Sequence, residues 1–428
     1  MSEEKNRSNN CCQRNYRQPE PFHCTIINRR RLIMRHGRLL LAMAVALPIL
    51  QLAAEEPPAA RVIDLKASDG VLIKATYFAA ARPGPGVLLL HQCNRQRKLW
   101  DGLARQLAAA GIHTLTMDLR GFGESGGTQQ DKLTPQEAAK VQTESWPGDI
   151  DTAFQYLTSQ QGVTPDIVGV GGASCGVNNS IQTARRHRAQ VKSLVLLSGG
   201  TDLAGRRFLR EANDLPELFA VAEDDEFRPT VDIMPWLFST STNPGKRYLH
   251  YTTGGHGADM FAVHPELRNE IVDWYVTTLV KTPGRAPAAK TTAPVPQWAE
   301  VVNQIEMPGG AARFAQRVAE ARRTNPKAVL FPEQIVNSMG YEHLQEGDTK
   351  LALEILKLNA MAFPESPNVY DSLSDAYLAD GQKELAQQNA RKALELLPSD
   401  TADPTERRNA IRDSAQQKLN QLGEGRPK

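Results

Sequence analysis

Between residues 59 and 280 of this 428-residue chain, short apolar runs alternate with segments whose apolar residues have helical spacing. Amphipathic segments with helical spacing lie between the runs, at residues 99–110, 150–158, 177–186 and 266–280. The apolar runs themselves recur at residues 86–90, 112–117, 167–170, 191–197, 218–221 and 247–251. This alternation predicts an α/β fold, with a mostly parallel sheet and helices on both of its faces. Sheets of this kind place their chemistry at the carboxyl ends of the strands.

Composition and charge narrow the classes of protein and partner. With 41% hydrophobic and 23% charged residues, the chain is ordinary globular protein, which excludes a disordered chain and a multi-span membrane protein. The formal net charge is +2, but residues 1–38 hold nine basic and three acidic side chains. The remainder has 41 basic and 45 acidic side chains, a net charge of −4. Because binding to nucleic acid needs a clustered positive face, nucleic acid is not an expected partner.

The amino-terminal segment has the pattern of a secretory signal peptide. Arg35 and Arg38 precede an apolar run over residues 39–52, which small residues follow. The run is too short to cross a bilayer core of about 30 Å comfortably. We therefore predict that residues 1–58 are an amino-terminal extension and signal peptide, with Met34 as an alternative start. The mature protein is then periplasmic or secreted, without a stable membrane span after cleavage; the alternative is an uncleaved anchor or a basic arm.

The pentapeptide Gly172-Ala173-Ser174-Cys175-Gly176 is a G-x-S-x-G sequence between a predicted strand and a predicted helix. In such a turn the serine is held in a strained conformation, and the residues two before and two after it must be very small. A serine hydroxyl is a weak nucleophile at neutral pH, so it needs a histidine to take its proton and a carboxylate to orient that histidine. The spacing predicts Ser174 as a nucleophile.

Other polar groups follow the neighbouring strands. His91-Gln92-Cys93 follows residues 86–90, the acidic trio 223–225 follows residues 218–221, and His256 follows residues 247–251. Over about residues 60–280 the sequence resembles the α/β-hydrolase family, in its esterase and dienelactone hydrolase branch, with nucleophile, acid and histidine in that family's order. The motif at residues 118–125 is also present in the family, and we expect it to be a structural turn.

The resemblance implies a role for each site residue. Ser174 is the expected nucleophile, His256 the general base and then acid, and Asp225, in preference to Asp224, the orienting carboxylate. The backbone N–H groups of Cys93 and Cys175 are the expected oxyanion hole. The family usually has His-Gly where this chain has His91-Gln92, so the loop that carries the second donor departs from the pattern.

Cys175 is the alternative nucleophile, because dienelactone hydrolases use a cysteine at this turn. Centring the turn on Cys175 would place Ala173 and Val177 at the two positions that must be smallest, which favours Ser174. If the oxyanion donors belong to Cys93 and Cys175, their backbones are neighbours, and an exported protein can join them by a disulfide. Two buried free thiols are the alternative.

Residues 281–296 contain four prolines and no large apolar residue, which predicts a semi-stiff linker. Beyond it, residues 297–428 are helical in pattern. Leu344, Gly347 and Pro364 recur 34 positions later as Leu378, Gly381 and Pro398. This period resembles the tetratricopeptide repeat, a helix pair that stacks on its neighbours. The amphipathic stretches near residues 298–323 and 405–422 are expected to cap the two repeats.

These observations predict an exported serine hydrolase that cleaves carboxylic esters through an acyl-enzyme. Residues 199–215 are too few for a large inserted cap, so we expect an open pocket and a small ester or acyl substrate. One alternative is a scaffold in which the helical repeats bind a peptide or protein partner; another is a peptidase of the same fold. The sequence contains no metal-ligand spacing, phosphate-binding loop or dinucleotide fingerprint, so neither a metal nor a cofactor is expected.

Overall fold

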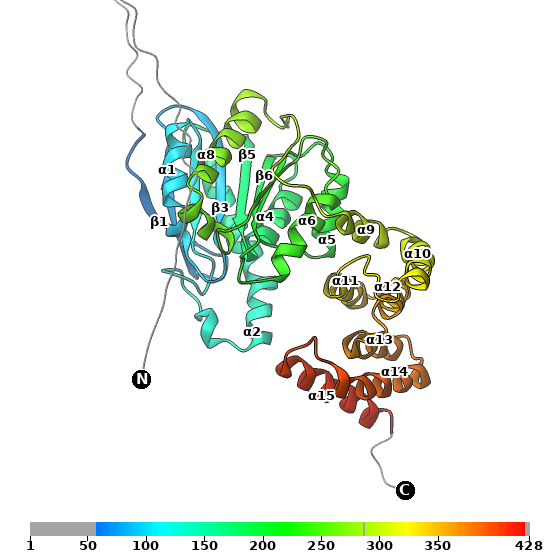
Figure 1. Cartoon of the computed structure of the whole chain (residues 1–428). Helices are drawn as coiled ribbons and strands as arrows, with labels where there is room; N and C mark the ends of the chain where they lie inside the picture. The colour runs from blue at the N-terminus through cyan, green and yellow to red at the C-terminus, as the bar shows by residue number, and fades with distance from the viewer. Residues whose placement is uncertain (1–56, 286, 424–428) are drawn as a thin grey trace, which may run out of the picture. The chain divides into compact units, whose positions relative to one another are not determined.

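The computed structural model describes residues 57–285 and 287–423, so the predicted signal peptide lies almost wholly outside it. A nine-stranded sheet has the order β1-β2-β4-β3-β5-β6-β7-β8-β9 (Figure 1). β1 pairs antiparallel with β2, and β2 with β4, whereas every other pairing is parallel. The strands are β1 Arg61–Lys66, β2 Leu72–Phe78, β3 Gly84–Leu90, β4 His113–Met117, β5 Val163–Ala173, β6 Val191–Leu197, β7 Glu217–Ala222, β8 Arg247–Tyr251 and β9 Lys290–Thr291. The predicted mostly parallel sheet is confirmed.

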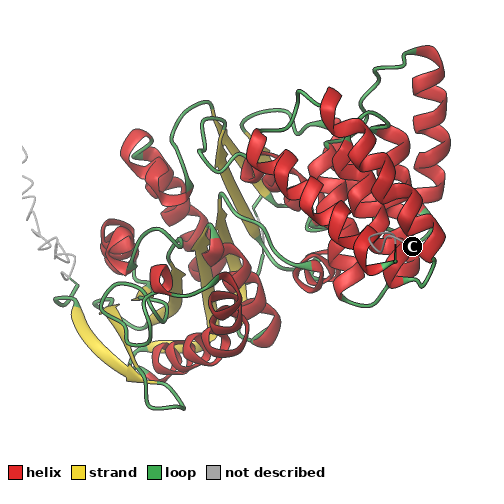
Figure 2. Cartoon of the chain, turned by 90° about the horizontal axis from the view of Figure 1, so that it is seen from below, coloured by secondary structure: helices red, strands yellow, loops and turns green. Residues whose placement is uncertain are grey.

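Helices cover both faces of this sheet, as Figure 2 shows. One core contains Ile150 of α3, Ile181 of α4 and Met234 of α6; the other contains Leu103 of α1 and Trp274 of α8. Both cores are apolar because the central parallel strands are buried on their two sides. The helices of this domain are α1 Asp101–Ala109, α2 Pro135–Lys140, α3 Trp146–Ser159, α4 Cys175–Arg186, α5 Leu203–Glu211, α6 Pro229–Thr240, α7 Met260–Val263 and α8 Glu266–Tyr275. This is the α/β-hydrolase fold.

The strand order reverses direction at β3. β4 lies on one side of β3 and β5 on the other, and Leu90 at the end of β3 is paired with Gly172 near the end of β5. The loops that follow β3 and β5 therefore leave the sheet side by side. A reversal of this kind opens a crevice at the carboxyl edge of the sheet, where α/β proteins bind their ligands.

The predicted linker at residues 281–296 is not a free spacer. Lys290 and Thr291 form β9, which pairs in parallel with β8, and Thr292 Oγ1 accepts a hydrogen bond of 2.7 Å from the His250 N–H. Val295 packs against the hydrolase core. The linker prediction relied on the absence of large apolar side chains and did not anticipate this strand, because an edge strand is held mainly by backbone hydrogen bonds.

Two helix pairs of the carboxyl-terminal domain repeat with the predicted period. α13 and α14 begin and end 34 residues after α11 and α12, and Gly347 and Gly381 have positive φ angles of 80° and 76° at the turn inside each pair. The assignment of these pairs to the tetratricopeptide repeat stays a prediction. The helices of this domain are α9 Gln297–Ile305, α10 Gly310–Thr324, α11 Glu333–Gln345, α12 Thr349–Ala362, α13 Pro367–Ala379, α14 Lys383–Leu396 and α15 Thr405–Gln421.

The carboxyl-terminal helices pack on the hydrolase domain. Trp236 of α6 belongs to the same apolar core as Val302 and Ile305 of α9. Beside this core, the fully buried Arg206 of α5 donates a hydrogen bond of 2.6 Å to Glu306. Shared apolar burial and a buried ion pair hold the two domains together. Among residues 57–285 and 287–423, no helix has both the length and the apolar character needed to cross a bilayer.

Candidate active site

Ser174 stands at a sharp turn between β5 and α4. Its φ of 54° and ψ of −121° are strained for a residue with a side chain, and Ser198 is the only other non-glycine residue with positive φ in the described part of the chain. A Cβ on Gly172 would lie 2.0 Å from the Gly176 carbonyl oxygen, and a Cβ on Gly176 would lie 2.4 Å from the Leu90 carbonyl oxygen. Only a register centred on Ser174 places glycine at both positions, as the G-x-S-x-G spacing requires.

Asp225 and His256 meet at the same edge of the sheet. Asp225 follows β7 and His256 follows β8, and His256 Nδ1 lies 2.9 Å from each carboxylate oxygen of Asp225. Both side chains are buried, Asp225 with 0% and His256 with 2% of its surface exposed. An ionised carboxylate can only accept hydrogen bonds, so the His256 Nδ1 that faces it carries a proton. In the neutral imidazole, Nε2 then has the free lone pair.

The environment of Asp225 keeps it ionised. Burial raises the pKa of Asp225, but hydrogen bonds from His256, the Thr230 hydroxyl (2.7 Å) and the Phe227 N–H (2.8 Å) outweigh it and hold the pKa below its usual range. Asp224 is exposed and instead accepts a hydrogen bond of 2.8 Å from the Gly255 N–H. The geometry thus joins His256 to Asp225 and leaves Asp224 outside the pair.

Gln92, in the loop after β3, is hydrogen-bonded to the loop that carries His256. Its Oε1 accepts a hydrogen bond of 2.8 Å from the Ala258 N–H, and its Nε2 donates to the His256 carbonyl at 3.4 Å. Gly257 lies close to the turn at Ser174, because a Cβ added to Gly257 would lie 3.2 Å from the Ala173 Cβ. These contacts of Gln92 were not expected from the sequence. Gln92 was notable there only because it stands where the family usually has the glycine of a His-Gly pair.

Cys93 and Cys175 are joined by a disulfide. Their sulfur atoms lie 2.13 Å apart and their Cα atoms 5.8 Å apart, so the structure brings together the two residues whose N–H groups are the expected oxyanion donors. Cys175 is the first residue of α4, where backbone N–H groups have no partner inside the helix and the helix dipole favours negative charge. A bonded Cys175 has no free thiol, so of the two candidate nucleophiles of this turn only Ser174 keeps its reactive group.

Other polar side chains near this edge have structural partners. His91 Nε2 accepts a hydrogen bond of 2.9 Å from the Leu119 N–H, and its Nδ1 donates to the Gln92 carbonyl at 2.8 Å. Burial lowers the pKa of His91, so both ring nitrogens serve the neutral form. Asp118 forms a buried ion pair with Arg97. Within the described ranges, no group of three or more His, Cys, Asp or Glu side chains is placed to hold a metal ion.

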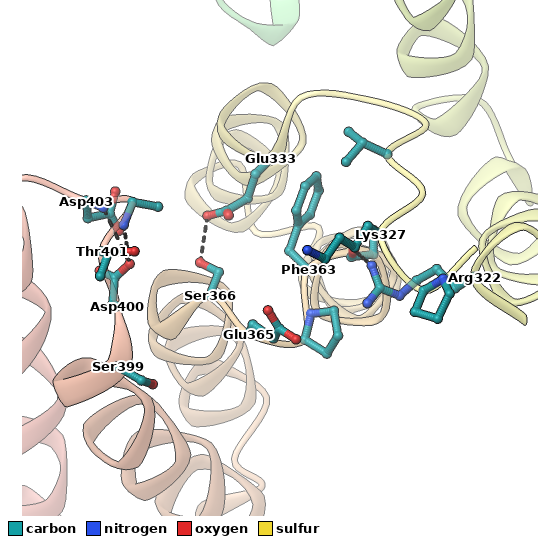
Figure 3. A pocket seen from close by; sticks show the side chains of 15 residues that line it. Arg322, Lys327, Glu333, Phe363, Glu365, Ser366, Ser399, Asp400, Thr401 and Asp403 are labelled. Carbon is teal, nitrogen blue, oxygen red and sulfur yellow. Dashed lines mark hydrogen bonds between the residues drawn. The ribbon is translucent and has the colours of Figure 1, made fainter.

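A separate cavity of about 370 Å³ lies in the helical domain, among the loops that join α10 to α11, α12 to α13 and α14 to α15. Figure 3 shows Arg322 and Lys327 on one side of it and Asp400 and Asp403 on the other. Glu333 lies between these sides and accepts a hydrogen bond of 3.1 Å from the Ser366 hydroxyl. The lining of this cavity therefore carries charges of both signs.

Comparison with known proteins finds similarity to a hydrolase family over part of the chain. Residues 81–222 match the family model described as serine aminopeptidase, S33. The chain is also 29% identical over 136 residues to an uncharacterized 31.7 kDa protein in the traX-finO intergenic region of Escherichia coli. This match covers 32% of the chain and 44% of the relative, so the chain spans less than half the length of the curated relatives it matches.

Solved structures of hydrolases resemble the chain over about half of its length. A dienelactone hydrolase from Anabaena variabilis is 19% identical and covers 53% of this chain and 100% of its own, with a TM-score of 0.41. An esterase from Pyrococcus furiosus is 14% identical and covers 51% of this chain and 91% of its own, also with a TM-score of 0.41.

Proposed function

We propose that this protein is an exported serine hydrolase that cleaves carboxylic esters, with Ser174, His256 and Asp225 as its catalytic triad. The observation that carries the proposal is the buried, hydrogen-bonded Asp225–His256 pair at the sheet edge where Ser174 is held in a strained turn. A histidine–carboxylate pair with a structural role does not need a strained turn beside it. Likewise, a strained turn with a structural role does not need a buried histidine–carboxylate pair beside it. Strained backbone of this kind persists where the surrounding structure enforces it, and it clusters at active sites.

In the proposed mechanism His256 Nε2 takes the proton of the Ser174 hydroxyl as the oxygen attacks the ester carbonyl. Negative charge then develops on the carbonyl oxygen and is stabilised by the N–H groups of Cys93 and Cys175. His256 returns the proton to the leaving alcohol, which produces an acyl-enzyme. Water then attacks the acyl carbon while His256 Nε2 takes its proton, and His256 passes this proton to Ser174 Oγ as the bond from Ser174 to the acyl group breaks and the carboxylic acid leaves. Asp225 stabilises the charged imidazole throughout.

The disulfide supports the proposed location. Disulfides persist in oxidising compartments and are rare in the cytosol, and residues 93 and 175 are the only cysteines within the described residues. A bond between them agrees with export to the periplasm or beyond. The proposed signal peptide is a separate argument from the sequence alone.

A peptidase is the second candidate, because the matching family model is described as a serine aminopeptidase. The same triad attacks esters and amides, and the two substrates differ chiefly in how readily the leaving group departs. Turnover of an aminoacyl amide at a rate comparable with ester turnover would favour the peptidase. The scaffold alternative, with a peptide partner on the helical repeats, requires no activated serine.

Labelling with a fluorophosphonate probe tests the proposed nucleophile. The wild-type protein is expected to be labelled at a single serine, because the probe reacts with a hydroxyl that a base has activated. Ser174→Ala should remove the label, whereas Ser68→Ala, at an exposed serine of the hairpin loop between β1 and β2, should leave it intact. Absence of labelling in the folded wild-type protein would favour the scaffold over the hydrolase. Labelling that persists in Ser174→Ala would assign the nucleophile to another residue.

Removal of the disulfide is expected to lower both activity and stability. In the variant Cys93→Ala/Cys175→Ala the two oxyanion donors are no longer tied together, and we expect kcat for ester hydrolysis to fall by roughly tenfold to a hundredfold. The free energy of unfolding is expected to fall by about 2–4 kcal/mol, since the bond closes a long loop in the unfolded chain. Kinetics well below the melting temperature and urea unfolding measure the two effects. Reductant should reproduce the loss in the wild type and have no further effect on the variant; an unchanged kcat would separate the disulfide from catalysis.

A further inference from the structure

A cavity of about 340 Å³ lies where the helical domain packs on the hydrolase domain. We call it the interdomain pocket. Gly200, Ile233 and Trp236 line it from the hydrolase domain, while Gln334, Ile335 and Ser338 of α11 line it from the helical domain. Its volume is at the lower end of the range of about 300–1,000 Å³ that is typical of pockets for small molecules. Arg228, Asp232, Glu342 and Arg407 also line it, but the larger part of its lining surface is apolar, which suits an apolar group.

Both loops that border the interdomain pocket also touch the proposed triad. A Cβ on Gly199 would lie 2.3 Å from the Ser174 carbonyl oxygen, so the chain that leads into Gly200 runs beside the backbone of the turn at Ser174. On the other loop, Arg228 lines the pocket, and the ring of the preceding residue, Phe227, lies 4.5 Å from the ring of His256. Residues adjacent to the proposed triad therefore lead directly into residues that line this pocket.

The wall contributed by the helical domain is held in place. Ile335 belongs to the apolar core that also contains Trp236 and Val302. Arg206 lies with its guanidinium 4.4 Å from the Trp236 ring and forms ion pairs with Glu306 and Glu342, the latter on α11. These contacts make α11 a fixed boundary of the pocket and not a flexible neighbour.

We propose that the helical domain completes the acyl-binding site of the hydrolase, and that the substrates are esters of acids with a medium-length apolar chain. The inference rests on the proposed serine hydrolase. It differs from the expectation of an open pocket, which considered only segments inside the hydrolase domain. Ser338 and Gln334 are the residues of the helical domain that set how long an acyl chain fits, because both are exposed at the rim of the pocket.

Acyl-chain preference in the full-length protein tests this proposal. Burying one methylene group is worth about fourfold in kcat/KM, so wild-type protein is expected to hydrolyse p-nitrophenyl hexanoate at least tenfold more efficiently than the acetate. Ser338→Trp fills the pocket and should lower this hexanoate-to-acetate ratio at least fivefold. Gln316→Trp, which introduces the same side chain at an exposed position of α10 away from the pocket, should leave the ratio unchanged. Gln334→Trp serves as the second filling variant if Ser338→Trp does not fold.

The outcomes separate this inference from the proposed function. A wild-type ratio near one, or a ratio that Ser338→Trp and Gln316→Trp change equally, overturns the acyl pocket while ester hydrolysis that depends on Ser174 still stands. Absence of any ester hydrolysis in folded wild-type protein overturns the proposed function, and the acyl pocket with it. A selective fall of the ratio in the two filling variants supports the pocket and assigns part of the substrate site to the helical domain.

Discussion

Asp225→Asn is expected to lower kcat for ester hydrolysis by about four orders of magnitude. An asparagine keeps the shape of the side chain but can present its amide N–H₂ to His256, which stabilises the wrong imidazole tautomer and removes the negative charge. His256 Nδ1 lies 2.9 Å from both carboxylate oxygens, so the effect acts directly on the base. Steady-state kinetics with a p-nitrophenyl ester measure it.

Asp224→Asn is the matched control for this experiment. Asp224 is exposed and accepts one hydrogen bond, from the Gly255 N–H, which an asparagine oxygen can also accept. We expect its kcat to stay within about threefold of wild type, since surface substitutions of this kind are nearly neutral. A large loss in Asp224→Asn with little loss in Asp225→Asn would exchange their assignments. Similar small losses in both would remove the aspartate from the mechanism.

Arg206→Met is expected to lower the free energy of unfolding by about 3–5 kcal/mol, because it removes one partner of a buried ion pair. Arg206 is fully buried and Glu306 is 5% exposed. Burial raises the pKa of Glu306. His343, 3.6 Å away, and the guanidinium groups of Arg206 and Arg210 outweigh this effect and hold the pKa well below its usual range. Glu306 therefore remains ionised at neutral pH, and the variant leaves this charge with fewer partners between the two domains.

The double variant Arg206→Met/Glu306→Met separates the ion pair from the packing around it. Replacing both partners of a buried pair by apolar residues of similar volume is often nearly neutral, so the double variant should recover at least half of the lost stability. Urea unfolding followed by tryptophan fluorescence measures four proteins: the wild type, Arg206→Met, Glu306→Met and the double variant. A double variant as unstable as the sum of its single variants would show that the two residues act independently, and would contradict the pairing.

The α/β arrangement and most of the candidate site were predictable from local patterns. Buried parallel strands are rich in apolar residues, so β3, β6 and β7 could be located from their side chains alone. The elbow at Ser174 was predictable because its backbone conformation requires tiny neighbours, and Gly172 and Gly176 are written in the sequence. The cysteines could be paired only through the family resemblance, which placed both of them at the oxyanion hole.

Three features could not be predicted because they depend on contacts between distant segments. Gln92 supports the loop of His256 across 166 positions of sequence, and nothing local distinguishes it from a surface glutamine. The strand at Lys290–Thr291 exists only because the edge of β8 accepts its backbone. Trp236 and Val302 share one apolar core, which holds together two domains that the proline-rich segment was expected to separate.

The sequence by itself determined the order of strands and helices, the strained turn at Ser174 and the chain order of nucleophile, acid and histidine, because each depends on the residue types of one short segment. Only the tertiary structure decided that Asp225 and not Asp224 faces His256, and that α11 borders a pocket between the two domains. Hydrophobic periodicity identifies the face of a helix that will be buried. It carries no information about the surface that buries it, since apolar attraction is non-directional and the partner is selected by shape across the whole fold.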